Sequence, residues 1–312
     1  MVKKKSSQSP KINVMSSSRF LEFRAQLIKA LKQKDKKKAI EKLCLRENTS
    51  LRQTYPSLTT LRRYYTYYRN ICRECLPEAP DDLLGTCLRI LNLTREEILL
   101  LNLQYGKKVS TEHRNLRALK NYDDMVLKAI QMLGNVSIYD RILALAFLTG
   151  RRVAEIACTA TFKTLKQPLK KNWMVFDGQL KAKTKQTGPY KIPVLAEPSL
   201  ILNGIKRLRV EKPHWIDQAI AFHNTGSPAL SVRVKKQFSE FTDNPTVKDL
   251  RAAYAEICYE WFATPKISKS RFFSDILGHG EDDNLTGQSY IDFYLEQSPE
   301  DGLADGLRGE AA

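Results

Sequence analysis

Four separated segments place strong cations and one tyrosine where they could act on a bound anion. In the first, residues 148–156, Arg151 and Arg152 follow an apolar helix at the start of a new one, where backbone N–H groups favour an anion. In the second, lysines crowd the loop of a β-hairpin, from which Lys183 or Lys185 can reach outward and protonate a leaving oxygen. The guanidinium fork of arginine suits a phosphodiester.

The other two segments lie about 100 residues further along the chain. Lys248 and Arg251 are three residues apart on a helix opened by Thr246, so both point to one face. A glycine-flanked histidine, His279, is followed eleven residues later by Tyr290. Each segment alone is typical of caps, solvated turns or packing, so only the ordered set suggests catalysis.

The charge of the chain favours a polyanionic partner. Its 312 residues carry a formal net charge of +17, but residues 281–312 hold nine acids and one arginine, which leaves +25 on residues 1–280. A body this basic is typical of nucleic-acid binding, with simple solubility as the alternative. An apolar share of 42% indicates a real core, and no apolar run reaches the roughly 18 residues of a membrane span. The first residues lack a signal peptide, so we expect a protein retained in the cell.

The six cysteines suit a reducing compartment. Cys72 and Cys75 have the spacing of half a zinc site, but no second pair follows, and Cys87 and His113 are the nearest additional ligands. We therefore predict buried thiols and no metal.

Helical periodicity dominates the chain. Before residue 170 no strand is expected, and residues 105–111 are the predicted linker between two domains because glycine and charge follow a Leu-rich helix. The predicted helices cover about residues 19–34, 39–46, 61–69, 111–119, 122–133, 138–148, 198–209, 214–223, 228–241 and 247–262, with a Leu-rich helix that begins at Thr94 and a new helix start near residue 152. The predicted N-caps are Thr59 or Thr60, the capping box of Thr94 with Glu97, and Ser137. Residues 173–183 and 190–195 predict a β-hairpin. The predicted fold class is mainly α with a small β-hairpin sheet (α+β).

A tyrosine cluster at residues 64–68 lies between Arg62, Arg63 and Arg69. Arginine on phosphates with tyrosine against sugars or bases is a common nucleic-acid surface. Tyrosines three and four apart on a helix are equally typical of a core stripe. Both interpretations stay open here, and they are compatible if one face packs while the arginines face DNA.

The ordered set resembles the tyrosine recombinase and type IB topoisomerase superfamily, and within it the hairpin telomere resolvases (protelomerases), over about residues 115–300. Residues 150–155 match a Gly-x-Arg-x-x-Glu box, which assigns Arg152, with Arg151 as its neighbour. Residues 182–185 match the Ala-Lys-Thr-basic context of the hairpin lysine, which assigns Lys183, with Lys185 as the alternative.

The remaining boxes continue the resemblance. Lys248-x-x-Arg251 is similar to the form in hairpin resolvases, whereas most recombinases carry His-x-x-Arg. Leu-Gly-His matches the third box at His279, and Tyr290 takes the place of the nucleophile. The gap between these two residues exceeds the nine residues usual in integrases, and Tyr294, four residues later, is the alternative nucleophile. We prefer Tyr290 because Tyr294, between Phe and Leu, is expected to pack.

The resemblance implies a metal- and ATP-independent DNA strand transferase without cofactor. A homodimer would cleave an inverted-repeat site in double-stranded DNA through 3′-phosphotyrosine and rejoin each end as a hairpin telomere. Arg152, Lys248 and Arg251 would bind the phosphate, His279 would donate a hydrogen bond, and Lys183 would protonate the leaving 5′ oxygen. The alternatives are a recombinase or integrase that exchanges duplex strands, a type IB topoisomerase, and a non-catalytic basic DNA-binding protein.

The expected organisation has four parts: a basic arm (1–18), a helical DNA-binding clamp (19–108), a tyrosine-recombinase-like catalytic domain (109–297) and an acidic tail (298–312). The clamp and the hairpin supply the candidate DNA-binding residues Arg62, Arg63, Arg69, Lys181 and Lys185. We expect a cytoplasmic, nucleoid-associated protein encoded by a bacterium or phage, without a membrane partner.

Overall fold

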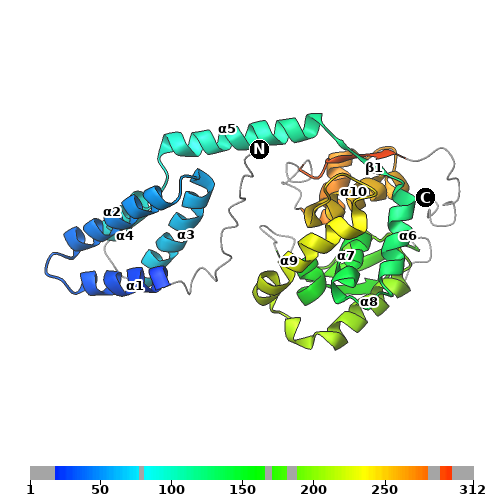
Figure 1. The fold of residues 1–312 in the computed structure, drawn as a ribbon, viewed down its shortest axis with the longest axis horizontal. Helices are drawn as coiled ribbons and strands as arrows, with labels where there is room; N and C mark the ends of the chain where they lie inside the picture. The colour runs from blue at the N-terminus through cyan, green and yellow to red at the C-terminus, as the bar shows by residue number, and fades with distance from the viewer. Residues whose placement is uncertain (1–17, 77–80, 166–170, 181–187, 280–288, 297–312) are drawn as a thin grey trace, which may run out of the picture. The chain divides into compact units, whose positions relative to one another are not determined.

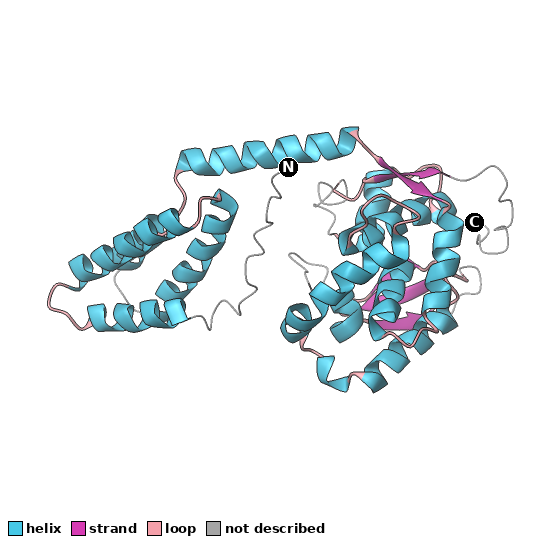
Figure 2. Cartoon of the chain, viewed as in Figure 1, coloured by secondary structure: helices cyan, strands magenta, loops and turns pink. Residues whose placement is uncertain are grey.

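The computed structural model describes residues 18–76, 81–165, 171–180, 188–279 and 289–296. The chain divides into two compact units, Met1–Lys108 and Val109–Ala312, each with its own hydrophobic core. Helices make up most of both units (Figure 1), and every strand in the described ranges belongs to the second unit (Figure 2). None of the helices in these ranges combines the length and the apolar composition of a membrane span. The mainly α, α+β fold class is therefore confirmed.

In the described part of the first unit, four helices pack around one core, against which the start of a fifth helix also packs. The four are α1 (Ser18–Leu31), α2 (Lys36–Thr54), α3 (Leu58–Cys75) and α4 (Asp81–Ile90). Ser57, rather than the predicted Thr59 or Thr60, caps α3, and Tyr65 and Tyr68 point from this helix into the core with exposed fractions of 1% and 0%. The buried hydroxyl of Tyr68 donates to Glu47 and accepts from Arg19, which satisfies its polar end. The core interpretation therefore holds for these two tyrosines.

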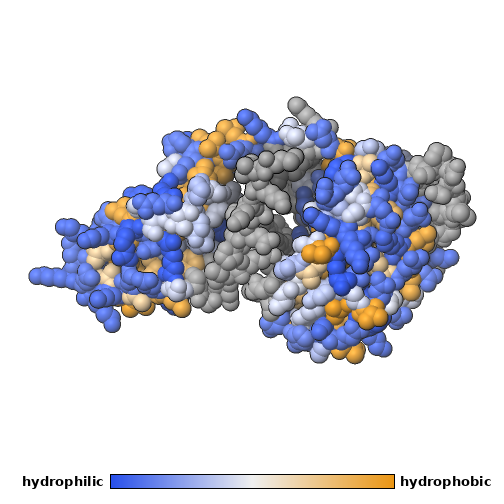
Figure 3. All heavy atoms as spheres, viewed as in Figure 1, coloured by the Kyte–Doolittle hydropathy of each residue, from blue (hydrophilic) through white to orange (hydrophobic). Residues whose placement is uncertain are grey.

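The boundary between the units falls inside α5 (Arg95–Arg114). Thr94 and Glu97 form the predicted capping box at its start. The boundary falls within the linker range predicted at residues 105–111, but α5 continues through this range instead of ending before it. One glycine, Gly106, costs a helix only about 1 kcal/mol, which does not break a 20-residue helix. Apolar side chains gather on the surface of α5, where Leu103 is 63% exposed (Figure 3).

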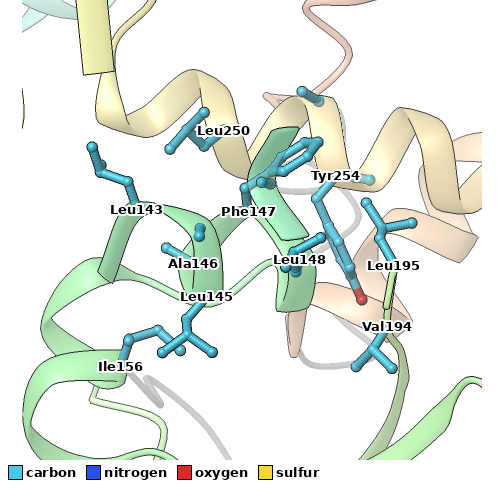
Figure 4. Close-up of a cluster of buried hydrophobic side chains, with 14 of the residues drawn as sticks. Leu143, Leu145, Ala146, Phe147, Leu148, Ile156, Val194, Leu195, Leu250 and Tyr254 are labelled. Atoms are coloured by element: carbon cyan, nitrogen blue, oxygen red, sulfur yellow. The ribbon is translucent and has the colours of Figure 1, made fainter. Parts of the chain in front are cut away.

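The second unit is built around a buried helix, α7 (Ile138–Thr149), capped by Ser137 as predicted. Every side chain from Asp140 to Thr149 is buried, and Figure 4 shows part of this cluster against Leu250 and Tyr254. Its other helices and turns are α6 (Tyr122–Met132), a π-helical turn (Glu155–Thr159), α8 (Pro198–Glu211), a 3-10 turn (Pro213–Trp215), α9 (Ala219–Phe238), α10 (Val247–Phe262) and α11 (Lys269–Leu277).

Two small sheets complete the second unit. The predicted hairpin is confirmed: β3 (Trp173–Asp177) pairs antiparallel with β4 (Tyr190–Pro193), and β2 (Thr161–Thr164) adds a third strand on the other side of β3. The other sheet pairs β1 (Arg117–Lys120) in parallel with β5 (Phe293–Glu296).

Three sequence predictions fail in this unit. Strands β1 and β2 precede residue 170, and the helix expected over 111–119 ends at Arg114 before β1 begins. The sequence of β1, Arg-Ala-Leu-Lys, consists of good helix formers, but pairing with β5 overrides this propensity. The two helices expected over 214–223 and 228–241 are one helix, α9, with Pro228 inside it. By contrast, the helix start expected near residue 152 is confirmed, because helical residues begin at Val153 and continue into the π-helical turn.

Candidate active site

A left-handed helix end positions the two neighbouring arginines. Gly150 ends α7 at φ 65°, and a Cβ at this position would lie 2.2 Å from the ring of Tyr254, so only glycine fits. Arg151 then turns into the core, where it donates to the carbonyl oxygens of Thr149 at 3.1 Å and Ile276 at 2.5 Å, and to the hydroxyl of Tyr190. All three guanidinium nitrogens of Arg151 thus donate to protein oxygens, and its side chain is 1% exposed, so Arg151 supports the site from within the core.

Arg152 remains accessible. Its side chain is 24% exposed, and its guanidinium forms an ion pair with Glu155 at 2.6 Å. The backbone N–H of Arg152 also donates to this carboxylate, at 3.0 Å. Of the two adjacent arginines, Arg152 is thus the one that can meet a phosphate.

Glu155 is a part of this site to which the sequence analysis assigned no role, although it completes the Gly-x-Arg-x-x-Glu box. Its carboxylate is buried, which raises its pKa, but Arg251, Arg152 and Arg151 outweigh burial and hold the pKa below its ordinary value. The carboxylate also accepts from the backbone N–H of Leu180 at 3.3 Å. Glu155 thereby links the arginines to the start of the lysine-bearing segment of the hairpin.

That segment, with Lys181, Lys183 and Lys185, lies outside the described residues, so the choice between Lys183 and Lys185 stays a prediction. Its point of departure is nevertheless defined. The side-chain amide of Gln179 donates to the carbonyl oxygen of Gly278, next to His279, at 2.8 Å. The hairpin therefore leaves the described structure beside two of the other site segments.

Arg251 joins the segments that are far apart in the sequence. Helix α10 begins with a capping box between Thr246 and Asp249, which sets the direction of its first turns. From this helix the two Nη atoms of Arg251 donate to the carbonyl oxygens of Gly150 and Leu277, both at 2.6 Å. Burial, together with the charge of Arg151, lowers the pKa of Arg251 to about 10, so it remains a cation at neutral pH.

The ring of Tyr290 is surrounded by the side chains of Arg251, Lys248 and His279. The guanidinium carbon of Arg251 lies 5.5 Å from the ring centroid, and the Nζ of Lys248 lies 5.8 Å from it. The imidazole of His279 stacks on the same ring, with centroids 5.6 Å apart and planes at 26°. His279 follows Gly278, whose positive φ of 70° ends α11. Two of the predicted phosphate-binding cations, from α10, and the predicted hydrogen-bond donor His279 thus converge on the predicted nucleophile.

The alternative nucleophile is placed differently. Tyr294 lies on β5, where it pairs with Ala118 of β1, and is 48% exposed. The expectation that it packs is wrong, because alternation along the strand buries its neighbour Phe293 instead. By contrast, Tyr290 is only 9% exposed, within the cluster of cations. The geometry favours Tyr290.

The candidate DNA-binding arginines of the first unit differ in exposure. Arg62 and Arg63 are exposed on α3, and Arg63 lies over the ring of Tyr67 at 5.9 Å. Arg69 is half-buried, with its Nε enclosed. Arg62 and Arg63 therefore present charge to solvent from the face opposite the buried tyrosines.

The cysteine arrangement differs from the Cys72–Cys75 pairing considered from the sequence. The sulfurs of Cys44, Cys72 and Cys87 lie within 4.8 Å of one another, whereas Cys75 is not part of the group. All six cysteines are free thiols, and the three grouped ones are fully buried. They come from α2, α3 and α4 and fill the core of the first unit as small apolar groups.

Comparisons with known proteins agree with this geometry. A family model described as the telomere resolvase ResT/TelK catalytic domain matches residues 115–293, a range that contains every candidate catalytic residue except the alternative Tyr294. No curated protein sequence matches the chain.

Solved structures extend the likeness to nearly the whole chain. Protelomerase TelA covalently complexed with substrate DNA is 25% identical with a TM-score of 0.78, covering 92% of this chain and 90% of that one. A point mutant of TelA complexed with a DNA hairpin product gives the same values. Protelomerase TelK complexed with substrate DNA shares the fold, with a TM-score of 0.57, 21% identity and 91% of this chain covered against 65% of that one. The chain belongs to the telomere resolvase family.

Proposed function

We propose that the chain cleaves double-stranded DNA at an inverted-repeat site by attack of Tyr290 and rejoins each end as a covalently closed hairpin. The observation that carries this proposal is the convergence of Lys248, Arg251 and His279 on the ring of Tyr290. The protelomerase structures that resemble the chain, one holding covalently bound substrate DNA and one a DNA hairpin product, support the same reaction.

The residues divide the chemistry among them. The phenol oxygen of Tyr290 forms a bond to phosphorus, the bond from phosphorus to the 5′ oxygen breaks, and a 3′-phosphotyrosine and a 5′-hydroxyl result. Arg152, Lys248 and Arg251 stabilise the charge on the non-bridging oxygens in the transition state, and His279 adds a hydrogen bond. The buried Nε of Arg251 has no partner within the described residues, so it is available to a phosphate oxygen.

The leaving oxygen needs a proton, and Lys183 supplies it, with Lys185 as the alternative. In the second step each 5′-hydroxyl attacks the phosphotyrosine of the opposite strand on its own duplex end, and Tyr290 leaves. One phosphodiester replaces another, so the exchange conserves the energy of the bond and uses no ATP.

A duplex has two strands, and each chain offers one such tyrosine. We therefore propose that two copies act on the two halves of the inverted repeat, one per strand. Exposed arginines on α3, together with the basic hairpin, bind the flanking duplex. We also propose that the protein acts in the cytoplasm at the nucleoid, where such a DNA substrate would be found.

The test uses a palindromic duplex without metal or nucleotide. Wild-type protein and Tyr294→Phe form a covalent protein–DNA adduct and hairpin products, whereas Tyr290→Phe binds DNA without forming an adduct. Adducts formed by Tyr290→Phe but not by Tyr294→Phe would reverse the assignment. Exchanged duplexes instead of hairpins would indicate a recombinase, and binding without any adduct from the wild-type protein would indicate a non-catalytic DNA-binding protein.

A second arm identifies the general acid. A substrate whose leaving oxygen is replaced by sulfur needs no proton, because a thiolate leaves readily. The lysine variant, Lys183→Ala or Lys185→Ala, that is slow on ordinary DNA and restored on the sulfur substrate marks the general acid. If neither is restored, the acid lies elsewhere.

A further inference from the structure

Arg117, the first residue of β1, contacts both elements that surround the nucleophile. Its two Nη atoms donate to the two carboxylate oxygens of Asp249, at 3.2 and 2.8 Å. Its guanidinium carbon lies 4.6 Å from the ring centroid of Phe293. Asp249 directly follows Lys248 on α10, and Phe293 comes three residues after Tyr290. One side chain therefore joins the first turn of α10 to the strand behind the nucleophile.

Both partners of Arg117 are themselves held in place. Asp249 is 6% exposed and closes the capping box by accepting from the backbone N–H of Thr246 at 2.8 Å. Phe293 is 1% exposed and is the register partner of Arg117 in the parallel β1–β5 pair. The backbone N–H of Arg117 also donates to the carbonyl oxygen of Asp292, at 3.0 Å. Motion of β5 against α10 would have to break this bidentate ion pair or the strand pairing.

The nucleophile depends on such support because it lies in a turn. Tyr290 follows Ser289 just before β5, and no helix or strand of its own fixes its backbone. Its position relative to α10 depends on how β5 lies against that helix and on the contacts of Lys248 with the carbonyl oxygen of Ser289 at 3.4 Å and the carboxylate of Asp292 at 3.5 Å. A displacement of about 1 Å in a catalytic geometry can cost on the order of 100-fold in rate.

We infer that Arg117 is a positioning residue for the cleavage reaction: by joining Asp249 to Phe293 it sets the phenol of Tyr290 against the cations of α10. This inference rests on the proposed role of Tyr290 as the nucleophile. Arg117 acts through its two partners and does not itself touch the scissile phosphate. Its loss should therefore slow the chemical step and leave the affinity for DNA unchanged.

The test compares the rate of the chemical step with binding. Arg117→Ala is assayed for single-turnover adduct formation at saturating protein, where we expect a decrease of about 100-fold. Affinity for the same duplex is measured in the Tyr290→Phe background, where adding Arg117→Ala should change it by less than about twofold. Arg117→Lys keeps the charge but loses the fork, so its cleavage rate should lie between that of the wild type and that of Arg117→Ala.

Arg233→Ala is the matched control. Arg233 donates to Asp140 at 2.9 Å, and Asp140 is likewise a buried carboxylate in the first turn of a helix, α7, at the end away from Gly150. This variant loses an ion pair with a single hydrogen bond to a buried carboxylate outside the site, so it should cleave at the wild-type rate.

Three outcomes would overturn the inference. In the first, Arg117→Ala cleaves at the wild-type rate. In the second, Arg117→Ala weakens DNA binding but keeps the wild-type cleavage rate at saturating protein. In the third, Arg233→Ala slows cleavage as much as Arg117→Ala does. The second result would make Arg117 a DNA ligand, and the third would make the effect general destabilisation. Failure of the proposed function shows separately, as adduct formation by Tyr290→Phe.

Discussion

Replacing Arg251 by lysine separates the charge at the site from the shape of the group that carries it. The two Nη atoms of Arg251 donate to the carbonyl oxygens of Gly150 and Leu277, each at 2.6 Å. A lysine ammonium keeps the charge, but its single nitrogen on an unforked chain cannot replace both donors in place. At least one buried, charge-assisted hydrogen bond is lost, which is worth about 1.5–3 kcal/mol.

The carbonyl oxygens that would lose this hydrogen bond belong to residues next to, or two positions before, site residues in the chain. Gly150 precedes the segment with Arg152, and Leu277 lies two residues before His279. If the loss is felt in full in the transition state, cleavage slows by about 10- to 150-fold, because each 1.4 kcal/mol is a factor of ten in rate. The free energy of unfolding should fall by a similar amount, since the same bond holds the folded chain together.

The assay pairs single-turnover adduct formation with urea unfolding, and Arg209→Lys is the control. Arg209 is a half-buried fork, whose two Nη atoms also donate to carbonyl oxygens, those of Ala157 at 2.6 Å and Ala160 at 3.1 Å. This variant undergoes the same chemical change outside the candidate catalytic set. It should lose about 1–3 kcal/mol of unfolding free energy and keep its cleavage rate.

Two results would refute this reasoning. If Arg251→Lys cleaves within about twofold of the wild type, the two carbonyl contacts do not organise the site. If Arg209→Lys slows cleavage as much as Arg251→Lys, the effect reflects lost stability and not the place of Arg251 beside Tyr290.

Two further predictions concern the same helix end. Because the folded pKa of Glu155 lies below its ordinary value of 4.5, its carboxylate stabilises the fold above that pH, and this contribution is lost as the pH falls through the folded pKa. The difference in unfolding free energy between the wild type and Glu155→Gln should be largest at pH 7 and shrink at pH 3, and a difference independent of pH would contradict the lowered pKa. Gly150→Ala places a Cβ 2.2 Å from the ring of Tyr254 at φ 65°, so we expect a loss of about 2–5 kcal/mol in chemical denaturation. A loss below about 1 kcal/mol would show that the buried ring moves aside easily.

Features set by near neighbours in the chain were predictable from the sequence. The capping box of Thr94 with Glu97 and the cap at Ser137 appear as expected, because each satisfies N–H groups within three residues of itself. The β-hairpin was predictable for the same reason. The family resemblance could also be recognised from the sequence, because it depends on residue types in a fixed order along the chain. The match to the family model confirms it.

Features that depend on pairing between distant residues were not predictable from the sequence. The residues of β1 have a high helix propensity, and only pairing with β5, near the other end of the second unit, makes this segment extended. Burial on one face of β5 is likewise what exposes Tyr294 and packs Phe293, the reverse of what their neighbours in sequence suggested. The sequence offered no signal at all for Arg117, because its partners Asp249 and Phe293 lie far along the chain.

The amino-acid sequence by itself determined which reactive side chains this protein contains and to which family it belongs. The Gly-x-Arg-x-x-Glu box assigned Arg152 over its neighbour Arg151, but it could not show the surroundings of either side chain. The tertiary structure encloses Arg151 in the core, whereas Arg152 is 24% exposed beside Glu155. The assembly of the site is equally a tertiary property: Arg251 bridges carbonyl oxygens 101 and 26 residues away, and such distances are set by the packing of the whole unit, not by any local preference.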